Sequence, residues 1–213
     1  MTALVALLLA GQVSQVSQVS QVSQVSQVEV ASAAPTAPHR FFVSSPYLSF
    51  TNWIGEDVGM YELHAGYRLT DRDRVGVKAV TWKLNKPLGI PAWDPALFEK
   101  SEYYPGRVRE YGVGAFYQRM LWRGLFATAE LVPLRKVFLD RHGKELETGF
   151  RLYASLHVGY HLSFFRDRLF IEPQVHCNGW PVDSKGPEGF RRMDARWNSY
   201  FLFEPNLYLG VNL

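Results

Sequence analysis

Apolar and polar residues alternate along most of the chain after residue 40. The clearest stretch is LETGFRLYASLHVGYHL, residues 146–162, in which every even-numbered position except Thr148 is apolar. The odd-numbered positions include Glu147, Arg151 and His157. A period of two places alternate side chains on opposite faces of a β-strand, whereas a helix would spread them around its circumference. The pattern therefore predicts a strand with one apolar face and one polar face.

The same alternation predicts seven further strands, over residues 41–50, 60–69, 75–84, 108–121, 125–138, 169–178 and 201–213, of which the first alternates least regularly. Short polar turns at 71–74, 122–124 and 165–168 separate some of these strands. The longest connections are residues 85–107 and 179–196. Pro173 and Pro205 fall inside predicted strands, where proline cannot donate to the ladder, so we expect a bulge at each.

Short turns that alternate with long loops along an even number of strands are typical of outer-membrane barrels. The predicted fold is therefore all-β, a closed antiparallel up-and-down transmembrane β-barrel of about eight strands with both of its ends on the periplasmic side. Over residues 40–213 the chain resembles the small eight-stranded outer-membrane barrels of Gram-negative bacteria, of the outer membrane protein A and X type. The strand pattern, the strand count and the terminal strand FLFEPNLYLGVNL carry this resemblance, although that family usually ends on an aromatic residue and this chain ends on Leu213. The resemblance implies an outer-membrane location.

The first 39 residues are predicted to lie outside this barrel domain. TALVALLLA, residues 2–10, is an apolar run too short to span a bilayer as a helix, and small residues follow it, as in a secretory signal peptide. The tripeptide VSQ then repeats from Val13 to Gln27, which indicates a low-complexity spacer. We expect residues 1–39 to be signal and spacer, and residues 40–213 to be the barrel.

Composition excludes several classes of function. With 213 residues, 47% hydrophobic and 15% aromatic, the chain is suited to one folded domain. Cys177 is the single cysteine, which excludes an internal disulfide and any CxxC metal or redox motif. The net charge of +3 comes from scattered basic residues, so nucleic acid is not an expected partner. We expect no cofactor and a monomer whose partners are outer-membrane lipids and lipopolysaccharide, with a surface protein as a further candidate.

Alternation alone does not decide whether the apolar face meets lipid, as in a membrane barrel, or an apolar core. The second arrangement is that of a secreted lipocalin-like carrier of a hydrophobic ligand. The polar face mixes acids, bases and glycines, which favours a narrow charged interior. An eight-stranded lumen is wide enough only for side chains, so we expect a salt-bridged interior and no open diffusion pore. The predicted lumen cluster comprises Glu62, His64, Arg68, Lys78, Glu110, Gln118, Glu130, Arg151, His157, Glu172 and Glu204.

Ser155 and His157 share one face of a predicted strand and suggest an envelope-lipid hydrolase. Lipid A deacylases are small barrels with such residues, but there the histidine precedes the serine and the site faces lipid. The favoured interpretation is a hydrogen-bonded interior pair. His157 and His161 lie four residues apart, about 13 Å along a strand, and cannot share a metal ion, so no metal site is predicted.

The two long loops hold candidate binding residues, since arginine pairs with phosphate and aromatic rings stack on sugars or partner proteins. The favoured interpretation is that these residues anchor the loops at the membrane interface. The leading hypothesis is an outer-membrane barrel with a structural or surface-interaction role. The loop candidates are Arg191, Arg192, Arg196, Trp93, Trp180 and Trp197.

Overall fold

The computed structural model describes residues 39–52, 59–91 and 93–213. The described residues form the strands β1 (Phe41–Pro46), β2 (Tyr61–Arg68), β3 (Asp73–Leu84), β4 (Arg107–Trp122), β5 (Leu125–Leu139), β6 (Glu145–Tyr160), β7 (Leu162–Phe164), β8 (Leu169–Asp183) and β9 (Tyr200–Asn212). They also form the helices α2 (Leu48–Thr51) and α3 (Glu188–Asp194) and the 3-10 turns η1 (Pro95–Phe98) and η2 (Lys100–Glu102). In this part of the chain no helix is long and apolar enough to cross a membrane. The predicted signal and spacer, apart from residue 39, lie outside the described residues.

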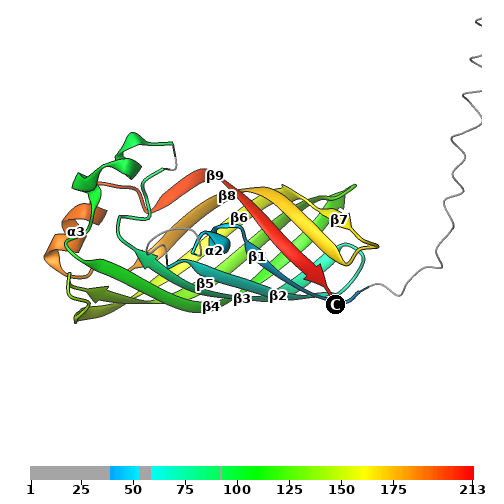
Figure 1. Cartoon of the computed structure of the whole chain (residues 1–213), viewed down its shortest axis with the longest axis horizontal. Coiled ribbons are helices and arrows are strands. Elements are labelled where there is room, and N and C mark those ends of the chain that lie inside the picture. The colour runs from blue at the N-terminus through cyan, green and yellow to red at the C-terminus, as the bar shows by residue number, and fades with distance from the viewer. Residues whose placement is uncertain (1–38, 53–58, 92) are drawn as a thin grey trace, which may run out of the picture. The chain divides into compact units, whose positions relative to one another are not determined.

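The sheet closes on itself. Consecutive strands pair antiparallel from β1 to β6, β6 pairs with β8, β8 with β9, and β9 returns to β1 (Figure 1). The three-residue β7 pairs with β8 and extends the line of β6. This ring of eight strands with one short addition confirms the predicted closed antiparallel up-and-down barrel. Among the described residues, closure pairs each long strand on both sides over most of its length, except the upper part of β9, which β1 does not reach.

The connections separate into two ends of the barrel. At one end lie the short turns β2–β3, β4–β5 and β7–β8, together with the C-terminus (Figure 1). The Leu213 N–H donates to the Phe41 carbonyl at 2.8 Å, so both ends of the barrel domain meet here. At the other end lie residues 85–106 and 184–199, which contain η1, η2 and α3 (Figure 1).

The first strand is shorter than predicted. β1 ends at Pro46, and residues 48–51 form α2 instead of continuing the strand to residue 50. Side chains then replace the missing ladder: Ser49 Oγ accepts from the Glu62 N–H at 3.1 Å, and Asn52 binds both the N–H and the carbonyl of Met60. The start of β2 pairs with β3 on one side, and on the other side it is satisfied by the side chains of Ser45, Ser49 and Asn52.

Pro173 does not produce the predicted bulge. The register is the same on both sides of it, from Gly159↔Gln174 to Leu162↔Ile171. Proline instead removes one donor from the ladder, and the opposing strand breaks at His161 between β6 and β7. The His161 N–H donates to the Gly124 carbonyl across the β4–β5 turn. The strand predicted over residues 146–162 is therefore interrupted.

An irregularity does occur beside Pro205. The β8–β9 register shifts between His176↔Glu204 and Asn178↔Phe201, and Phe203 takes a left-handed backbone conformation with φ of 61°. One extra residue in a strand exchanges the two faces of everything beyond it. Phe201, which the alternation placed on the outer face with residue 209, is consequently buried inside the barrel.

The exterior of β3 and β4 carries a band without charges. On β3 the outward positions between Asp73 and Lys83 are Val75, Val77, Ala79 and Thr81, and on β4 those between Arg109 and Arg119 are Tyr111, Val113, Ala115 and Tyr117. The flanking charged residues are register partners on the two strands: Asp73 lies opposite Arg119, and Lys83 lies opposite Arg109. Ten residues at about 3.3 Å each, on strands tilted by about 40°, give a band about 25 Å tall. This matches the height of the apolar band of outer-membrane barrels.

The interior is layered. A small cluster of Phe42, Phe116 and Phe170 fills the end near the short turns, and a larger apolar cluster that includes Trp82, Leu134 and Trp180 fills the end near the loops. The polar residues lie mainly between and among these layers. We call the end near the long loops the upper end and the end near the short turns the lower end. The upper interior is more apolar than the predicted polar lumen, because the inward positions of several strands hold valine, leucine and aromatic residues.

Glycines make the lower aromatic layer possible. A Cβ atom at Gly66 would lie 2.2 Å from the Phe42 ring, and one at Gly210 would lie 2.0 Å from the Phe170 ring. These two glycines are on strands next to the phenylalanines that they accommodate. Their small size lets large rings cross a narrow lumen.

Candidate functional site: the charged lumen and the loop cap

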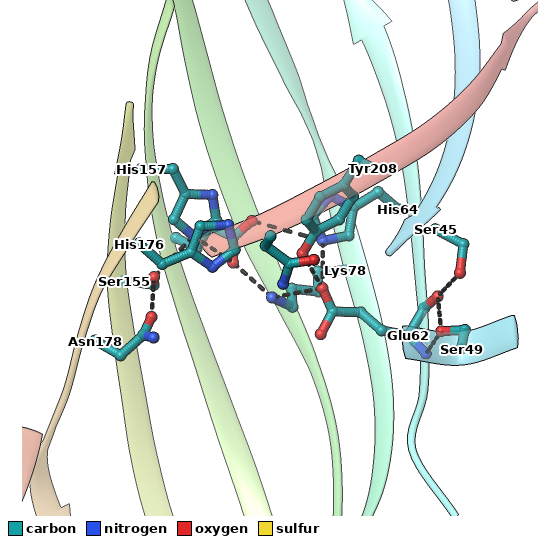
Figure 2. Close-up of polar contacts among 12 residues, drawn as sticks. Ser45, Ser49, Glu62, His64, Lys78, Ser155, His157, His176, Asn178 and Tyr208 are labelled. Carbon is teal, nitrogen blue, oxygen red and sulfur yellow. Dashed lines mark hydrogen bonds and ion pairs between the residues drawn. The ribbon is translucent and has the colours of Figure 1, made fainter. Parts of the chain in front are cut away.

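The centre of the lumen is organised around Lys78 on β3. Its Nζ lies 2.9 Å from Glu62 Oε1 on β2 and 2.7 Å from Glu130 Oε2 on β5. His64 Nε2 lies 3.3 Å from Glu62 and 3.5 Å from Glu130. Figure 2 shows Glu62 and His64 of β2 and Lys78 of β3 pointing toward one another. Buried charges require such partners, because an isolated buried ion is expensive to desolvate.

Further polar groups extend this network toward β9. The Tyr208 hydroxyl donates to Glu62 Oε1, and Asn178 Nδ2 donates to Glu204 Oε2 at 2.7 Å. His176 Nδ1 is 3.9 Å from the same Glu204 oxygen. Glu62 and Glu130 thus share one lysine, while Glu204 is held by an amide and lies beside His176.

Ser155 and His157 form the expected interior pair, with Ser155 Oγ 2.7 Å from His157 Nε2. The nearest acid, Glu130, lies 3.6 Å from that same nitrogen. In a hydrolytic triad the acid holds the opposite ring nitrogen while the first accepts the serine proton. Here the serine hydroxyl donates to Asn178 Oδ1, and both Ser155 and His157 are fully enclosed. The pair lacks the geometry and access of a nucleophile.

His157 and His176 are cross-strand neighbours whose rings stack in parallel, with centroids 3.6 Å apart. Stacking places the ring faces, and not the nitrogen lone pairs, toward each other. Within the described ranges no group of three or more His, Cys, Asp or Glu side chains is arranged to hold a metal ion.

Two more ionic clusters lie above and below the centre. In the upper one Arg151 binds Glu110 at 2.9 Å and Asp183 through two nitrogens at 3.0 Å, and Lys136 binds Asp183 at 2.7 Å. The lower one contains Glu172, which contacts Arg74 at 3.3 Å, His161 at 2.8 Å and Gln118 at 3.4 Å. Below it Arg68 binds Asp167 at 2.9 Å.

The structure thus places all eleven predicted lumen residues on the interior side, in three groups and not one. Sequence reasoning missed several partners. Lys136 shares the even-numbered parity of Glu130 on the same strand, and this signal could have found it. Asp183 had no such signal, because it lay beyond the predicted end of its strand at residue 178.

The long loops form a cap over the upper end. Phe190 of α3 packs between Tyr104 and Phe138, with ring centroids 5.1 and 5.3 Å away. The Tyr104 hydroxyl donates to Asp194, which ties the two loops together. Burial raises the pKa of the Asp194 carboxyl above its ordinary value, and burial together with the charge of Asp194 raises that of Tyr104 well above its own. Glu102 adds a second tie, at 2.7 Å from Arg196 and 3.0 Å from Trp197 Nε1.

The six predicted loop residues separate into different settings. Trp180 belongs to β8, because that strand continues to Asp183, and its ring is buried under Arg151. Arg196 and Trp197 are engaged with Glu102, as described. Arg191 and Arg192 lie exposed on α3 beside Glu188, and Trp93 is 63% exposed. Trp180, Trp197 and Arg191 line a cavity of about 190 Å³ at the lumen mouth.

Comparisons with known proteins give one match of note. No protein-family model matches the chain, and no curated protein matches it. Among solved structures, the crystal structure of Neisserial surface protein A (NspA) is similar over 81% of this chain and 97% of that one, with 12% sequence identity and a TM-score of 0.47. The strand pairing described above, and not this likeness, carries the fold.

Proposed function

We propose that the chain is an outer-membrane β-barrel protein with a structural or surface-interaction role. The uncharged outer band, about 25 Å tall between two rows of charge, is the observation that carries the proposal. Exposed apolar side chains such as Leu63, Val113 and Leu156 cover this band, while the ionised side chains lie inside. A soluble barrel has the opposite arrangement, because water would solvate the charges and the apolar residues would form the core.

Fractionation tests the location. The protein is expected to sediment with outer membranes and to enter solution only with detergent. An unboiled sample should migrate differently from a boiled one on a denaturing gel, because the closed barrel resists unfolding by detergent. Recovery in the aqueous phase without detergent would disprove the membrane location and favour a lipocalin-like carrier.

The lumen is proposed to act as a filled plug and not as a diffusion pore. Phe42, Phe116 and Phe170 cross the lower end, the Lys78 network crosses the middle, and the apolar cluster with the loop cap crosses the upper end. Planar-bilayer recordings on the purified protein should show no stable conductance. Steady single-channel steps would contradict a plugged lumen.

A lipid hydrolase is the less favoured alternative. The acid and the serine share one nitrogen of His157, and Ser155 is enclosed. Mass spectra of lipid A from cells that express the wild type and the Ser155→Ala variant should be identical. A mass difference equal to one acyl chain would revive the hydrolase.

The loop end is proposed to contact lipopolysaccharide. Arg191 and Arg192 are exposed, and Trp93 and Phe98 add exposed aromatic surface. Guanidinium groups pair well with phosphates. The double variant Arg191→Gln/Arg192→Gln should retain less lipopolysaccharide during purification than Arg141→Gln/Lys144→Gln, which removes the same charge from an exposed turn at the same end. Equal retention would refute this contact and leave a surface protein as the candidate partner.

A further inference from the structure

The barrel wall changes character between α2 and the upper half of β9. β1 follows β9 as far as the bond from the Tyr47 N–H to the Leu207 carbonyl, and among the described residues no backbone bond continues that ladder to residues 201–206. On the opposite side Ser49 and Asn52 satisfy the start of β2 through their side chains. Among the described residues, the wall here is therefore made by α2. The outward residues of β9 at this height, Leu202, Phe203 and Pro205, are uncharged.

A cavity lies behind this part of the wall. It measures about 50 Å³ and is lined by residues of α2, β2 and β9, including Leu48, Met60, Phe201 and Glu204, and it reaches Lys78 and His176. A wider groove of about 360 Å³ shares Leu48, Met60, Phe201 and Glu204 with the cavity and continues between α2 and residues 83–103. An apolar groove thus leads to a polar end. A volume of about 50 Å³ accommodates a group larger than one water molecule.

The polar end offers acceptors and negative charge. Lys78 is engaged by Glu62 and Glu130, which leaves Glu204 without a lysine or arginine partner among the described residues. His176 lines the cavity, is only 3% exposed, and its Nε2 has no hydrogen-bond partner within the described part of the chain. With the proton of His176 on Nδ1, which faces Glu204, Nε2 is an acceptor. The cavity therefore calls for a cation that donates hydrogen bonds.

We propose that the cavity and the groove beside α2 form a binding site for an alkylammonium group. The ammonium nitrogen has three donors and one positive charge, and it lies against Glu204 and His176. Its hydrocarbon chain occupies the groove formed by Leu48, Met60 and Phe201. The groove continues beside Lys83, Lys86 and Tyr103, so a ligand reaches the site along α2 from the end of the barrel near the long loops. This site is additional to the surface role proposed above.

Isothermal titration of the purified barrel with hexylammonium tests the proposal, with hexan-1-ol as the uncharged ligand of equal chain length. We expect saturable binding of one hexylammonium and at least tenfold weaker binding of hexan-1-ol. Glu204→Gln should weaken hexylammonium binding at least tenfold. Glu99→Gln, the same change on an exposed loop residue, should leave it unchanged.

Leu48→Trp fills the groove without touching the charge, and it should also weaken binding while the unboiled protein keeps its gel mobility. If Glu204→Gln does not fold, Leu48→Trp and the alcohol comparison decide the question. Equal binding of hexylammonium and hexan-1-ol, or binding unaffected by both variants, would overturn the proposal. Competition by lysophosphatidylethanolamine but not by lysophosphatidylcholine identifies a lipid headgroup as the source of the amine, and its absence assigns the site to free amines.

Discussion

Removing the Lys78 ammonium should destabilise the barrel more than any surface substitution. Lys78→Met keeps the length of the side chain but leaves Glu62 and Glu130 without their shared cation, which lies 2.9 and 2.7 Å from their oxygens. Breaking a buried ion pair by removing one partner costs about 3–5 kcal/mol, because the remaining charge is stranded in a poorly solvated site. At 1.4 kcal/mol for each factor of ten, the folding constant should fall by about 10² to 10⁴.

The assay is urea unfolding of the barrel refolded into lipid vesicles, followed by gel mobility and tryptophan fluorescence. Lys144→Met is the matched control, because Lys144 is exposed in the β5–β6 turn. The double variant Lys78→Met/Glu130→Gln removes one of the stranded charges and should recover most of the loss, and the cycle of variants then measures the coupling. A loss below about 1 kcal/mol for Lys78→Met, or a double variant no more stable than the single one, would refute the reasoning that this pair is buried and mutually dependent.

Three other outcomes are expected, for the lipid-facing band, for the cap and for Asp194. Leu156→Arg, at an outward position that is 63% exposed, should cost about 2–4 kcal/mol in vesicles, whereas Glu147→Arg beyond the band should be neutral; equal effects would count against the lipid-facing band. Phe190→Ala should expose the loops to protease by loosening their contact with Tyr104 and Phe138, a core truncation typically worth about 3–5 kcal/mol, while gel mobility stays unchanged; loops as resistant as in the wild type would argue against the cap. Burial raises the pKa of the Asp194 carboxyl in the folded protein, so the stability that this group contributes is complete below its unfolded pKa and is lost as the pH rises through its folded pKa. Hydrogen exchange over α3 should therefore accelerate with pH by more than the intrinsic exchange rate does. Asp194→Asn should abolish that additional acceleration, and an unchanged pH profile in the variant would contradict the argument.

The gel-mobility and hydrogen-exchange experiments distinguish the stability of the barrel from that of the loop cap. Gel mobility reports the closed ring of strands, and exchange over α3 reports the cap alone. Phe190→Ala should therefore alter one readout and not the other, since α3 contacts the barrel through Phe138 at the end of β5. A simultaneous loss of both would mean that the cap and the barrel fold as one unit.

Most of the fold could be predicted because strand alternation is a local property. The two faces of β6 follow directly from the residues between 146 and 160, and the short turns and long loops follow from the lengths of the segments between the alternating stretches. The errors occur where one residue acts on its neighbours across the sheet. Pro173 breaks the strand opposite to it, and Phe203 adds a residue that turns Phe201 inward. Neither effect is visible in the segment that contains it.

For the candidate site, parity within a strand indicated which side chains share the interior, as for Glu62 and His64 on β2. It could not indicate partners, because these depend on the register between strands and on the shear of the closed ring. Lys78 meets Glu130 from a strand that is not its neighbour, across the lumen. The gap beside α2 was equally hidden, since it results from β1 ending at Pro46 while β9 continues upward.

The sequence by itself determined the fold class of this molecule, a closed all-β barrel. The alternation specifies strands with one apolar face and one polar face, and in a membrane such strands can satisfy their backbone hydrogen bonds only by pairing in a closed sheet. The tertiary structure decided which charges neutralise each other, which loops tie down the cap and where the wall is incomplete. The physical reason is range. Backbone preference and hydrophobic pattern act over a few residues, whereas ion pairing and cavity formation depend on atoms that approach only after the sheet has closed.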